Sequence, residues 1–246
     1  MKVIKLGGSL LDDPRRRKRA LDVIVHAWQQ GEELVLVHGG GKHVDASLAK
    51  LGIAKKTHAG LRVTDDDTLA VVVATLGGSV NKMLVAELAA RNIRAAGISG
   101  CDGATLTAIP HEPVDGVELG HVGRVTGANR TLLRAMLTYG MLPVVSTVAL
   151  GPDGALLNVN ADSGAAAIAI ALGAKTLHFI TDVAGLFDQD GNVVPSLTAT
   201  DAHALLASDV VHGGMRPKLM AALDALQSGV SQISIGEEGG TTLVAA

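Results

Sequence analysis

The chain has 246 residues, of which 48% are hydrophobic and only 18% are charged, so its composition excludes a disordered polypeptide and allows a large buried core. Lys and Arg number 21 against 24 Asp and Glu, and this net charge of −3 gives no overall attraction to nucleic acid or to an acidic membrane. The single cysteine, Cys101, cannot form an internal disulfide, and Gly7 and Gly8 interrupt the first apolar stretch. We therefore expect a compact cytoplasmic protein with one domain or two closely fused lobes.

Two short apolar stretches run directly into glycines and then into a helical pattern. The first covers residues 1–11 and includes Gly7 and Gly8, and the second covers residues 34–41 and ends in three glycines. A strand, a glycine turn and a helix in succession bring backbone N–H groups against an anion. A glycine pair alone is typical of an ordinary tight turn, but Lys5 at the end of the first strand can reach a bound phosphate. The pattern predicts a phosphate-handling enzyme.

The intervening residues alternate between helix and strand. Asp13 and Pro14 begin a helix that ends at Gly31, and its first turns contain the basic run Arg15–Arg19. No aromatic residues interleave this run, so we interpret it as a solvated helix face rather than a nucleic-acid patch. A strand over 34–38 and a helix over 42–51 follow. This order predicts an α/β fold with a mainly parallel sheet covered by helices on both faces.

The middle of the chain is less regular. Residues 55–64 are too polar for a central strand and predict a projecting hairpin or lid. The expected elements after it are a helix over 66–88, a strand and glycine turn over 95–103, hairpins over 105–125, a helix over 130–139 and a strand over 142–146.

The last third contains a second concentration of charged and glycine residues. Residues 158–162 open a helix over 163–172 that is apolar on every face and therefore buried, and we expect it to join the two lobes. Asp162 is interpreted either as the N-cap of this helix or as a catalytic group, and the two roles are compatible. A strand over 176–181 leads to Asp182–Phe187, which suits either a nucleotide site at the sheet edge or an ordinary turn.

Lys218 stands near the start of the next helix, which ends at about Gln227. A lysine in the first turn faces the positive end of the helix dipole, which is unfavourable unless an anion shares the space. The residue is therefore either a charge that faces a ligand or a surface lysine whose aliphatic chain lies along the protein.

Seven motifs in this order resemble those of the acetylglutamate kinase family, in the amino acid kinase superfamily. They are Lys5–Ser9, His38–Gly41, Gly60–Thr64, Gly120–Gly123, Asn158–Asp162, Thr181–Gly185 and Gly213–Lys218. The resemblance implies a three-layer αβα sandwich with a mainly parallel central sheet, formed by a single domain over residues 1–246. Its N-terminal lobe, about 1–172, would bind the acyl amino acid and form a dimer, and its C-terminal lobe, about 173–246, would bind ATP.

The resemblance also implies roles for particular residues. Lys5 and Lys218 would be catalytic and flank the transferring phosphoryl group, and Asp162 would hold both lysines in place. The substrate-binding residues would be Gly40, Gly41, Arg62, which would grip a substrate carboxylate, and Asn158. The nucleotide-binding residues would be Gly7, Gly8, Asp182, Val183, Ala184, Gly185, Leu186, Phe187, Val210, Val211 and His212. Mg²⁺ would be held by ATP oxygens and water, so no protein metal site is expected.

The implied reaction is ATP-dependent phosphorylation of the γ-carboxylate of N-acetyl-L-glutamate, the second step of arginine biosynthesis by the acetylated route. The acceptor is already an anion, so the reaction needs no general base, only alignment and charge neutralisation. Two alternatives stay open: a kinase for a related N-acylated acid such as N-acetyl-aminoadipate in lysine biosynthesis, and a non-catalytic amino acid or nucleotide sensor.

Two residues depart from the pattern of the resembling family. Lys42 adds a positive charge after the glycine triplet, and Cys101 lies in a loop on the substrate side, where we interpret it as a small buried filler. Arginine-inhibited relatives carry an extra N-terminal helix that links dimers into a hexamer, whereas only Met1 and Lys2 precede the first strand here. The resemblance therefore predicts a homodimer that arginine does not inhibit.

Overall fold

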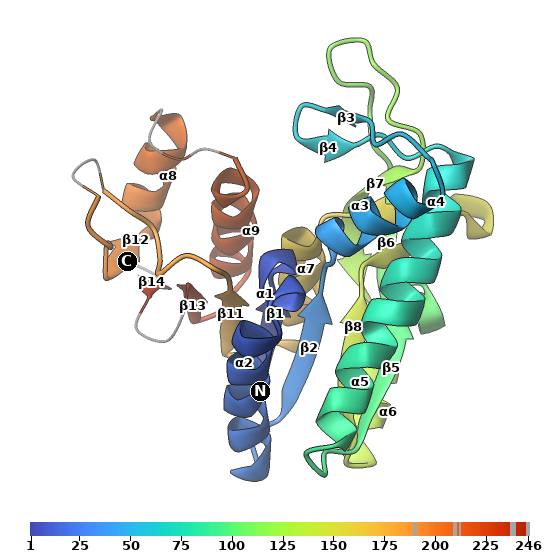
Figure 1. The fold of residues 1–246 in the computed structure, drawn as a ribbon. Helices are drawn as coiled ribbons and strands as arrows, with labels where there is room; N and C mark the ends of the chain where they lie inside the picture. Colours follow the sequence, from blue (N-terminus) through green and yellow to red (C-terminus); the bar gives the residue numbers. More distant parts are fainter. Residues whose placement is uncertain (189–190, 209–210, 212, 237–239, 245–246) are drawn as a thin grey trace.

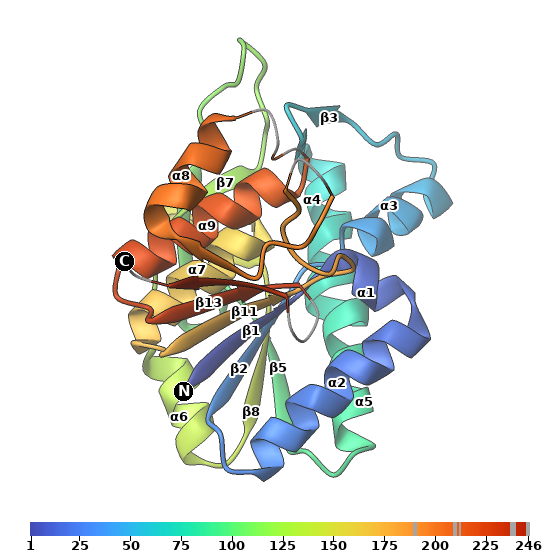
Figure 2. The ribbon, with the colours of Figure 1, turned by 90° about the vertical axis from the view of Figure 1, so that its left-hand side faces the viewer.

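The computed structural model describes residues 1–188, 191–208, 211, 213–236 and 240–244. Its centre is a twisted sheet with helices on both faces, as the side view in Figure 2 shows. This arrangement confirms the predicted three-layer αβα sandwich. The N-terminal strand lies in the middle of the sheet, so the first residues of the chain are enclosed by later ones.

The sheet has eight strands among the described residues. In spatial order they are β12 (Ser196–Thr198), β14 (Thr241–Val244), β13 (Gln232–Ile235), β11 (Thr176–Ile180), β1 (Lys2–Leu6), β2 (Leu34–His38), β8 (Leu142–Ser146) and β5 (Ala95–Ser99). The run from β13 to β5 is parallel, and β14 pairs antiparallel with β13. Strands of a parallel run bring their carboxyl ends to one edge, so the turns after β1, β2 and β11 lie at the same edge.

The residues of β1 alternate between two hydrophobic cores. Val3 packs in the core beneath α7 (Ala161–Leu172), and Ile4 and Leu6 pack in the core beneath α2 (Pro14–Gln29). The α7 side also carries α6 (Thr131–Thr138), α8 (Ala199–Ala207) and α9 (Met215–Gln227), and the α2 side carries α1 (Gly8–Asp12), α3 (Gly41–Lys50), α4 (Asp66–Val73) and α5 (Asn81–Ala89). Side chains at odd and even positions of β1 therefore reach opposite faces of the sheet.

Two smaller β units stand at one end of the sheet. A closed barrel contains β6 (Leu106–Pro110), β7 (Val122–Ala128), β9 (Val148–Leu150) and β10 (Leu156–Val159), and a hairpin contains β3 (Thr57–His58) and β4 (Leu61–Arg62). The hairpin confirms the predicted projection over residues 55–64, and it lies beside α3 in Figure 1. The chain between β6 and β7 forms the loop at the top of the same view. Short 3₁₀ turns lie at Asp102–Ala104 and Pro152–Gly154.

The start of α2 is set by a side-chain cap. The Asp13 carboxylate accepts hydrogen bonds from the backbone N–H groups of Arg15 and Arg16, at 2.8 and 3.2 Å, which confirms the predicted start of α2. The expectation that residues 158–162 open the next helix is wrong in its first part. Asn158 lies in β10, and α7 begins only at Ala161.

The helix predicted over residues 66–88 is continuous but not uniform. It comprises α4, a π-helical segment over Ala74–Val80, and α5. By length and composition alone, Asp66–Ala89 passes as a membrane-spanning helix. Here α5 contacts β5 and β8 and α4 contacts α3, so the helix packs as part of the αβα sandwich.

Candidate active site

Three charged side chains meet where β1 and two helices converge. Lys5 is near the end of β1, Asp162 is in the first turn of α7, and Lys218 is in the first turn of α9. The Lys5 Nζ lies 2.8 Å from Asp162 Oδ1, and the Lys218 Nζ lies 3.0 Å from Asp162 Oδ2. The residues that the sequence singled out from three distant segments thus form one ion-paired cluster, named here the Lys–Asp–Lys cluster.

The cluster is buried and carries more positive than negative charge. Lys5, Asp162 and Lys218 are 7%, 5% and 6% exposed, and one carboxylate faces two ammonium groups. Burial raises the pKa of Asp162, but the charges of Lys5 and Lys218 outweigh it and hold that pKa below its ordinary value. Burial and the neighbouring Lys5 lower the pKa of Lys218. Because an unbalanced buried cation is costly, the cluster favours the entry of an anion.

The interpretation of Asp162 as the N-cap of its helix is wrong. The cap is Asn160, whose side-chain oxygen accepts hydrogen bonds from the backbone N–H groups of Asp162 and Ser163, at 2.8 and 3.2 Å. Since Asn160 satisfies these donors, both oxygens of Asp162 stay available to the lysines.

The interpretation of Lys218 as a surface lysine is also wrong. Its ammonium group lies 5.5 Å from the centre of the buried Phe179 ring, a cation–π contact that supports a desolvated charge. Lys218 therefore points into the protein, where a charge can act on a bound ligand.

The two glycine turns lie against each other beside the cluster. A Cβ on Gly8 would come within 3.4 Å of the Gly41 nitrogen and 3.7 Å of the Gly40 Cα. Gly40 has φ +155°, which L side chains rarely adopt, and its backbone positions the start of α3. The first N–H groups of α1 and α3 have no acceptors within their own helices. The adjacent turns therefore provide backbone donors that an anion can share.

Arg62 and Asn158 form a polar strip on the hairpin side of these turns. The Arg62 Nη2 donates to the Gly41 carbonyl oxygen at 3.0 Å and also pairs with the carboxylate of Asp45, on α3. The Arg62 Nη1 is buried and has no hydrogen-bond acceptor in the described part of the chain. The Asn158 Nδ2 donates to Thr64 Oγ1 at 3.2 Å, and Thr64 Oγ1 donates to the Arg62 carbonyl at 2.8 Å. A free guanidinium donor beside a side-chain amide suits a substrate carboxylate.

The segment Asp182–Phe187 leaves β11 at the same edge of the sheet. A Cβ on Gly7 would lie 3.6 Å from the Thr181 Cα, which places the first glycine turn against this segment. Burial raises the pKa of Asp182, but hydrogen bonds from Ser9 and Thr181 and its own backbone bring that pKa below its usual value. Leu186 is anchored by its N–H, which donates to Thr241 Oγ1 at 2.8 Å.

The other residues assigned to nucleotide binding differ in exposure. Val183 is half-buried, Ala184 is exposed, Gly185 is buried and Phe187 is 43% exposed. Val211 is buried, whereas Val210 and His212 lie outside the described residues.

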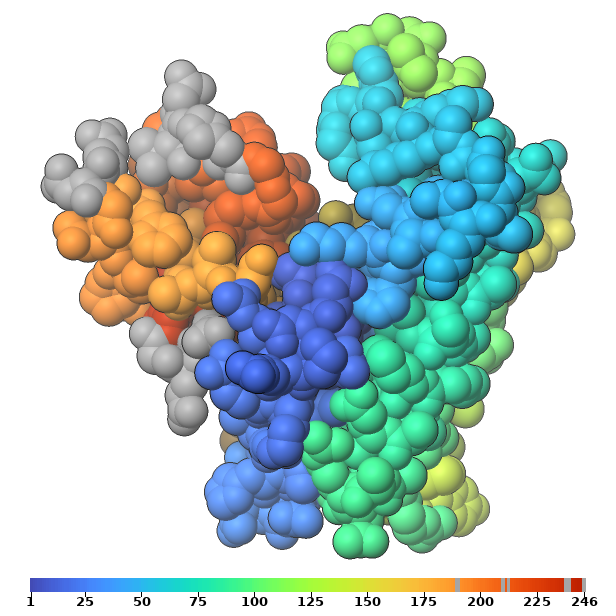
Figure 3. Space-filling model, viewed as in Figure 1, coloured from blue at the N-terminus to red at the C-terminus, as the bar shows by residue number. Residues whose placement is uncertain are grey.

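Figure 3 shows a deep hollow between the part that contains α8 and α9 and the part that contains α3 and the hairpin.

Four partners of these residues were given no role from the sequence: Ser9, Asp45, Thr64 and Phe179. Phe179 follows His178 in the strand predicted over residues 176–181. Because neighbouring strand residues point to opposite faces of a sheet, the sequence indicates which strand residues share a face with Phe179. Asp45 gives no such signal, because its contact with Arg62 forms only after α3 and the hairpin pack together.

Histidines and acidic residues do not form a metal centre in the part of the chain described here. No group of three or more His, Cys, Asp and Glu side chains is placed to hold an ion within these ranges. His38 is fully buried, and its Nδ1 lies 2.8 Å from the Gly39 carbonyl oxygen.

The two residues that depart from the family pattern have partners outside the cluster. Lys42 pairs with Asp12 at 3.5 Å. Cys101 is half-buried, and burial and the neighbouring Asp102 raise the pKa of its thiol.

Comparison with known sequences identifies relatives along nearly the whole chain. A sequence profile of the amino acid kinase family matches residues 1–237. The acetylglutamate kinase of Solibacter usitatus (strain Ellin6076) is 42% identical over 258 residues, with 99% of each chain covered. The acetylglutamate kinase of Geobacillus thermodenitrificans (strain NG80-2) is 42% identical over 233 residues, which are 95% of this chain and 88% of that protein.

Solved structures share the fold. A protein from Streptococcus mutans UA159 superposes with a TM-score of 0.84 at 28% identity, covering 99% of this chain and 98% of its own. Giardia lamblia carbamate kinase bound to AMP-PNP superposes with a TM-score of 0.69 over 100% of this chain and 98% of its own, at 14% identity, which shows likeness of fold alone. From the profile match, the close relatives and the shared architecture, the chain belongs to the amino acid kinase family.

Proposed function

We propose that this chain is an acetylglutamate kinase, which transfers the γ-phosphoryl group of ATP to the γ-carboxylate of N-acetyl-L-glutamate in arginine biosynthesis. The observation that carries the proposal is the Lys–Asp–Lys cluster, with its buried excess of positive charge. Full-length relatives that bear this name support the choice of reaction.

The transfer forms one bond and breaks another. A γ-carboxylate oxygen of the substrate attacks the γ-phosphorus, and the bond from that phosphorus to the bridging oxygen breaks as ADP leaves. Negative charge then spreads over the transferring oxygens and the leaving group. Lys5 and Lys218 neutralise this charge from within a buried site, where an ammonium group acts more strongly than in water. Asp162 holds both ammonium groups in position.

Substrate and nucleotide take opposite sides of the cluster in this proposal. The Arg62 guanidinium binds a carboxylate of the acyl amino acid, and Asn158 and the Gly40–Gly41 backbone bind its remaining polar groups. Gly7, Gly8, the segment Asp182–Phe187 and residues 210–212 hold ATP. The lobes divide near residue 172, although one continuous sheet and one shared core run across that boundary.

The magnesium ion of ATP is proposed to bind nucleotide oxygens and water. The donor set agrees with this arrangement, because both oxygens of Asp162 already contact lysine ammonium groups and are poorly suited to a metal. When bound, the ion neutralises β- and γ-phosphate charge.

The test is a direct assay of product. Acyl phosphates react with hydroxylamine to give hydroxamates, so ATP, Mg²⁺ and the purified chain are incubated with N-acetyl-L-glutamate, N-acetyl-L-aspartate, N-acetyl-L-2-aminoadipate or free glutamate. ADP and hydroxamate are expected in equal amounts, with the highest kcat/KM for N-acetyl-L-glutamate. A preference for the aminoadipate derivative would assign the lysine route, and binding without turnover would assign a sensor.

We further propose a homodimer formed by the apolar outer surface of the α4–α5 helix. Ala70, Ala74 and Ala86 are exposed on this helix, and a second copy would cover them. Sedimentation equilibrium is expected to give the mass of a dimer, and Ala86→Arg to shift it toward the monomer. Ala49→Arg on the exposed side of α3 is the matched control.

A further inference from the structure

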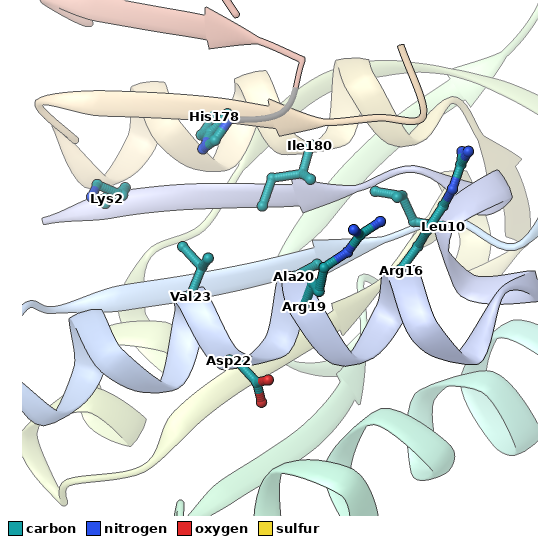
Figure 4. Close-up of a pocket in the computed structure, with 9 residues that line it drawn as sticks. All are labelled: Lys2, Leu10, Arg16, Arg19, Ala20, Asp22, Val23, His178 and Ile180. Atoms are coloured by element: carbon teal, nitrogen blue, oxygen red, sulfur yellow. The ribbon is translucent and has the colours of Figure 1, made fainter. Parts of the chain in front are cut away.

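A cavity lies on the sheet face opposite the Lys–Asp–Lys cluster. It has a volume of about 550 Å³ and opens between α2 and the strands β1 and β11. Its lining is Lys2, Leu10, Arg16, Arg19, Ala20, Asp22, Val23, His178 and Ile180, shown in Figure 4. Cavities of this size hold small organic ligands.

The alternation of side chains along β1 separates this cavity from the active site. Lys5 points to the α7 face and reaches Asp162, whereas Lys2 lines the cavity on the α2 face. On the neighbouring strand, Phe179 lies under Lys218, whereas His178 and Ile180 line the cavity. Because the sheet stands between the two sites, a ligand in the cavity is not a substrate of the phosphoryl transfer.

The charges that line the cavity are unevenly compensated. Asp22 already pairs with Lys18 at 2.6 Å and with Arg91 at 3.1 Å, two residues that do not line the cavity. Arg16 lies 3.8 Å from Asp13, and its charge also acts on Asp182, whose pKa it helps to lower. Within the described ranges Arg19 has no ion pair, although it lies on the same helix. Arg19 therefore faces the cavity without an ion pair, and Arg16 is balanced in part by Asp13 and Asp182.

The floor between these cations is apolar. Leu10, Ala20 and Ile180 are buried, and Val23 keeps 47% of its surface exposed. Figure 4 shows the Arg16 and Arg19 side chains extending from α2 toward β1 and β11, with Ile180 and Val23 between Arg19 and the Lys2 end. A ligand that matches this lining needs an apolar body and an anionic head.

We propose that the cavity binds a small organic anion that has an apolar body and a carboxylate or phosphate head. The head forms bidentate hydrogen bonds with Arg19 and Arg16, whose planar guanidinium groups suit either anion. The body covers Ile180 and Val23. Inorganic phosphate has no apolar body and binds much more weakly.

The experiment uses 1-anilinonaphthalene-8-sulfonate as the probe, because it joins an aromatic body to one anionic group. Its fluorescence is titrated against the full chain in saturating Mg²⁺ and ATP, which occupy the nucleotide site. Arg19→Gln is expected to raise the Kd of the probe at least about tenfold, as for a lost charge-assisted hydrogen bond. Arg15→Gln makes the same change on the same helix outside the cavity and is expected to leave the Kd unchanged.

Displacement then distinguishes the two possible heads. Phenyl phosphate and phenylacetate compete with the probe under the same conditions, and stronger competition by one of them assigns a phosphate or a carboxylate. Inorganic phosphate and acetate at equal concentration are expected not to compete. An unchanged Kd in Arg19→Gln, equal losses in Arg19→Gln and Arg15→Gln, or loss of probe binding on addition of ATP would overturn the proposal.

A second variant tests the floor. Val23→Glu places a negative charge beside the proposed apolar body at an exposed position, so folding should persist and the circular dichroism spectrum should not change. The probe is expected to lose binding in this variant, and retained affinity would contradict the proposed position of its body.

Discussion

Lys218 contacts both oxygens of the Asp162 carboxylate, with its Nζ 3.1 Å from Oδ1 and 3.0 Å from Oδ2. Lys5 shares the same carboxylate from the end of β1. The shared contact ties the first turn of α9 to the first turn of α7 and to the central strand. An ammonium group held in this way needs no rearrangement when a phosphoryl group arrives.

Lys218→Ala is expected to lower kcat for N-acetyl-L-glutamate by about 10²–10³, the range for the loss of one preorganised charge. The KM values should change little, because the charge is most useful when negative charge develops in the transition state. Steady-state kinetics measure both, with Lys50→Ala on the exposed end of α3 as the control. An unchanged kcat with a raised KM would assign Lys218 to ground-state binding instead.

Asp162→Asn removes the carboxylate that separates two buried ammonium groups. Breaking a buried ion pair in this way costs roughly 3–5 kcal/mol in the free energy of unfolding. Mg²⁺-ATP should raise the melting temperature of this variant more than that of the unmodified chain, because the phosphates replace the lost negative charge. Thermal unfolding with and without nucleotide tests this, and Asp153→Asn at an exposed turn is the control.

Arg62→Ala is expected to raise the KM for N-acetyl-L-glutamate sharply and to change the KM for ATP little. A guanidinium that binds a substrate carboxylate contributes in the ground and transition states alike. Lys55→Ala is the matched control, because Lys55 also pairs with Asp45, at 2.8 Å, but lies outside the polar strip. If instead the KM for ATP increases, Arg62 belongs to the nucleotide side and the proposed arrangement is reversed.

His38 should make stability depend on pH in mildly acidic solution. Burial lowers the pKa of this histidine from 6.5 to about 4. Below about pH 6.5 His38 is protonated in the unfolded chain, but in the folded chain it stays neutral down to about pH 4. Stability therefore decreases as the pH falls through this window. The shift corresponds to a loss of about 2 kcal/mol between pH 7 and pH 5.

Urea unfolding at these two pH values measures that contribution. The difference between pH 7 and pH 5 should be smaller by about 2 kcal/mol in His38→Asn than in the unmodified chain, whatever the absolute stability of the variant. His26→Asn on the exposed side of α2 should keep the original pH dependence. An unaltered pH dependence in His38→Asn would show that the buried ring is not the titrating group.

Gly40→Ala should destabilise the protein more than Gly52→Ala. Both glycines have positive φ, but a Cβ on Gly40 would lie 2.9 Å from Leu76 Cδ2, whereas a Cβ on Gly52 meets no atom within 4 Å. At Gly52, where φ is +71°, a left-handed backbone alone costs a residue other than glycine about 1–2 kcal/mol, whereas φ at Gly40, +155°, lies outside the αL region. Equal losses in the two variants, measured by chemical unfolding, would exclude a packing contribution at Gly40.

The parts of the fold that were predicted from the sequence depend on local patterns. The apolar runs before Gly7 and Gly39 predicted β1 and β2, and Asp13 with Pro14 predicted the start of α2, because strands, turns and caps are set by neighbouring residues. The buried ion pair of Lys218 was not predictable in this way. The local sequence around a lysine in a first helical turn is the same whether the helix end faces water or Asp162.

The errors have a common physical origin. Asp162 and Asn160 are both good N-cap residues, and in the structure Asn160 caps the helix while the Asp162 carboxylate pairs with Lys5 and Lys218. The contact of Arg62 with Asp45 likewise needs the hairpin to fold over α3. Such partners are decided by packing between segments, which local propensity does not describe.

The π-helical segment Ala74–Val80 divides one continuous helix between two cores. Val71, Val72 and Leu76 pack in the core around α3, whereas Val80, Leu84 and Leu88 pack in the core beneath α2. An α-helix turns by about 100° per residue, and a π-helical turn contains more residues than an α-helical one. The π-helical segment therefore sets the angle about the helix axis between the apolar residues before it and those after it. Deleting one residue from the segment would restore a uniform α-helix and rotate one of these groups by about 100° relative to the other. The helix could then fill either core but not both, and Leu76 would stay beside the Gly40 turn only if the core around α3 were the one retained.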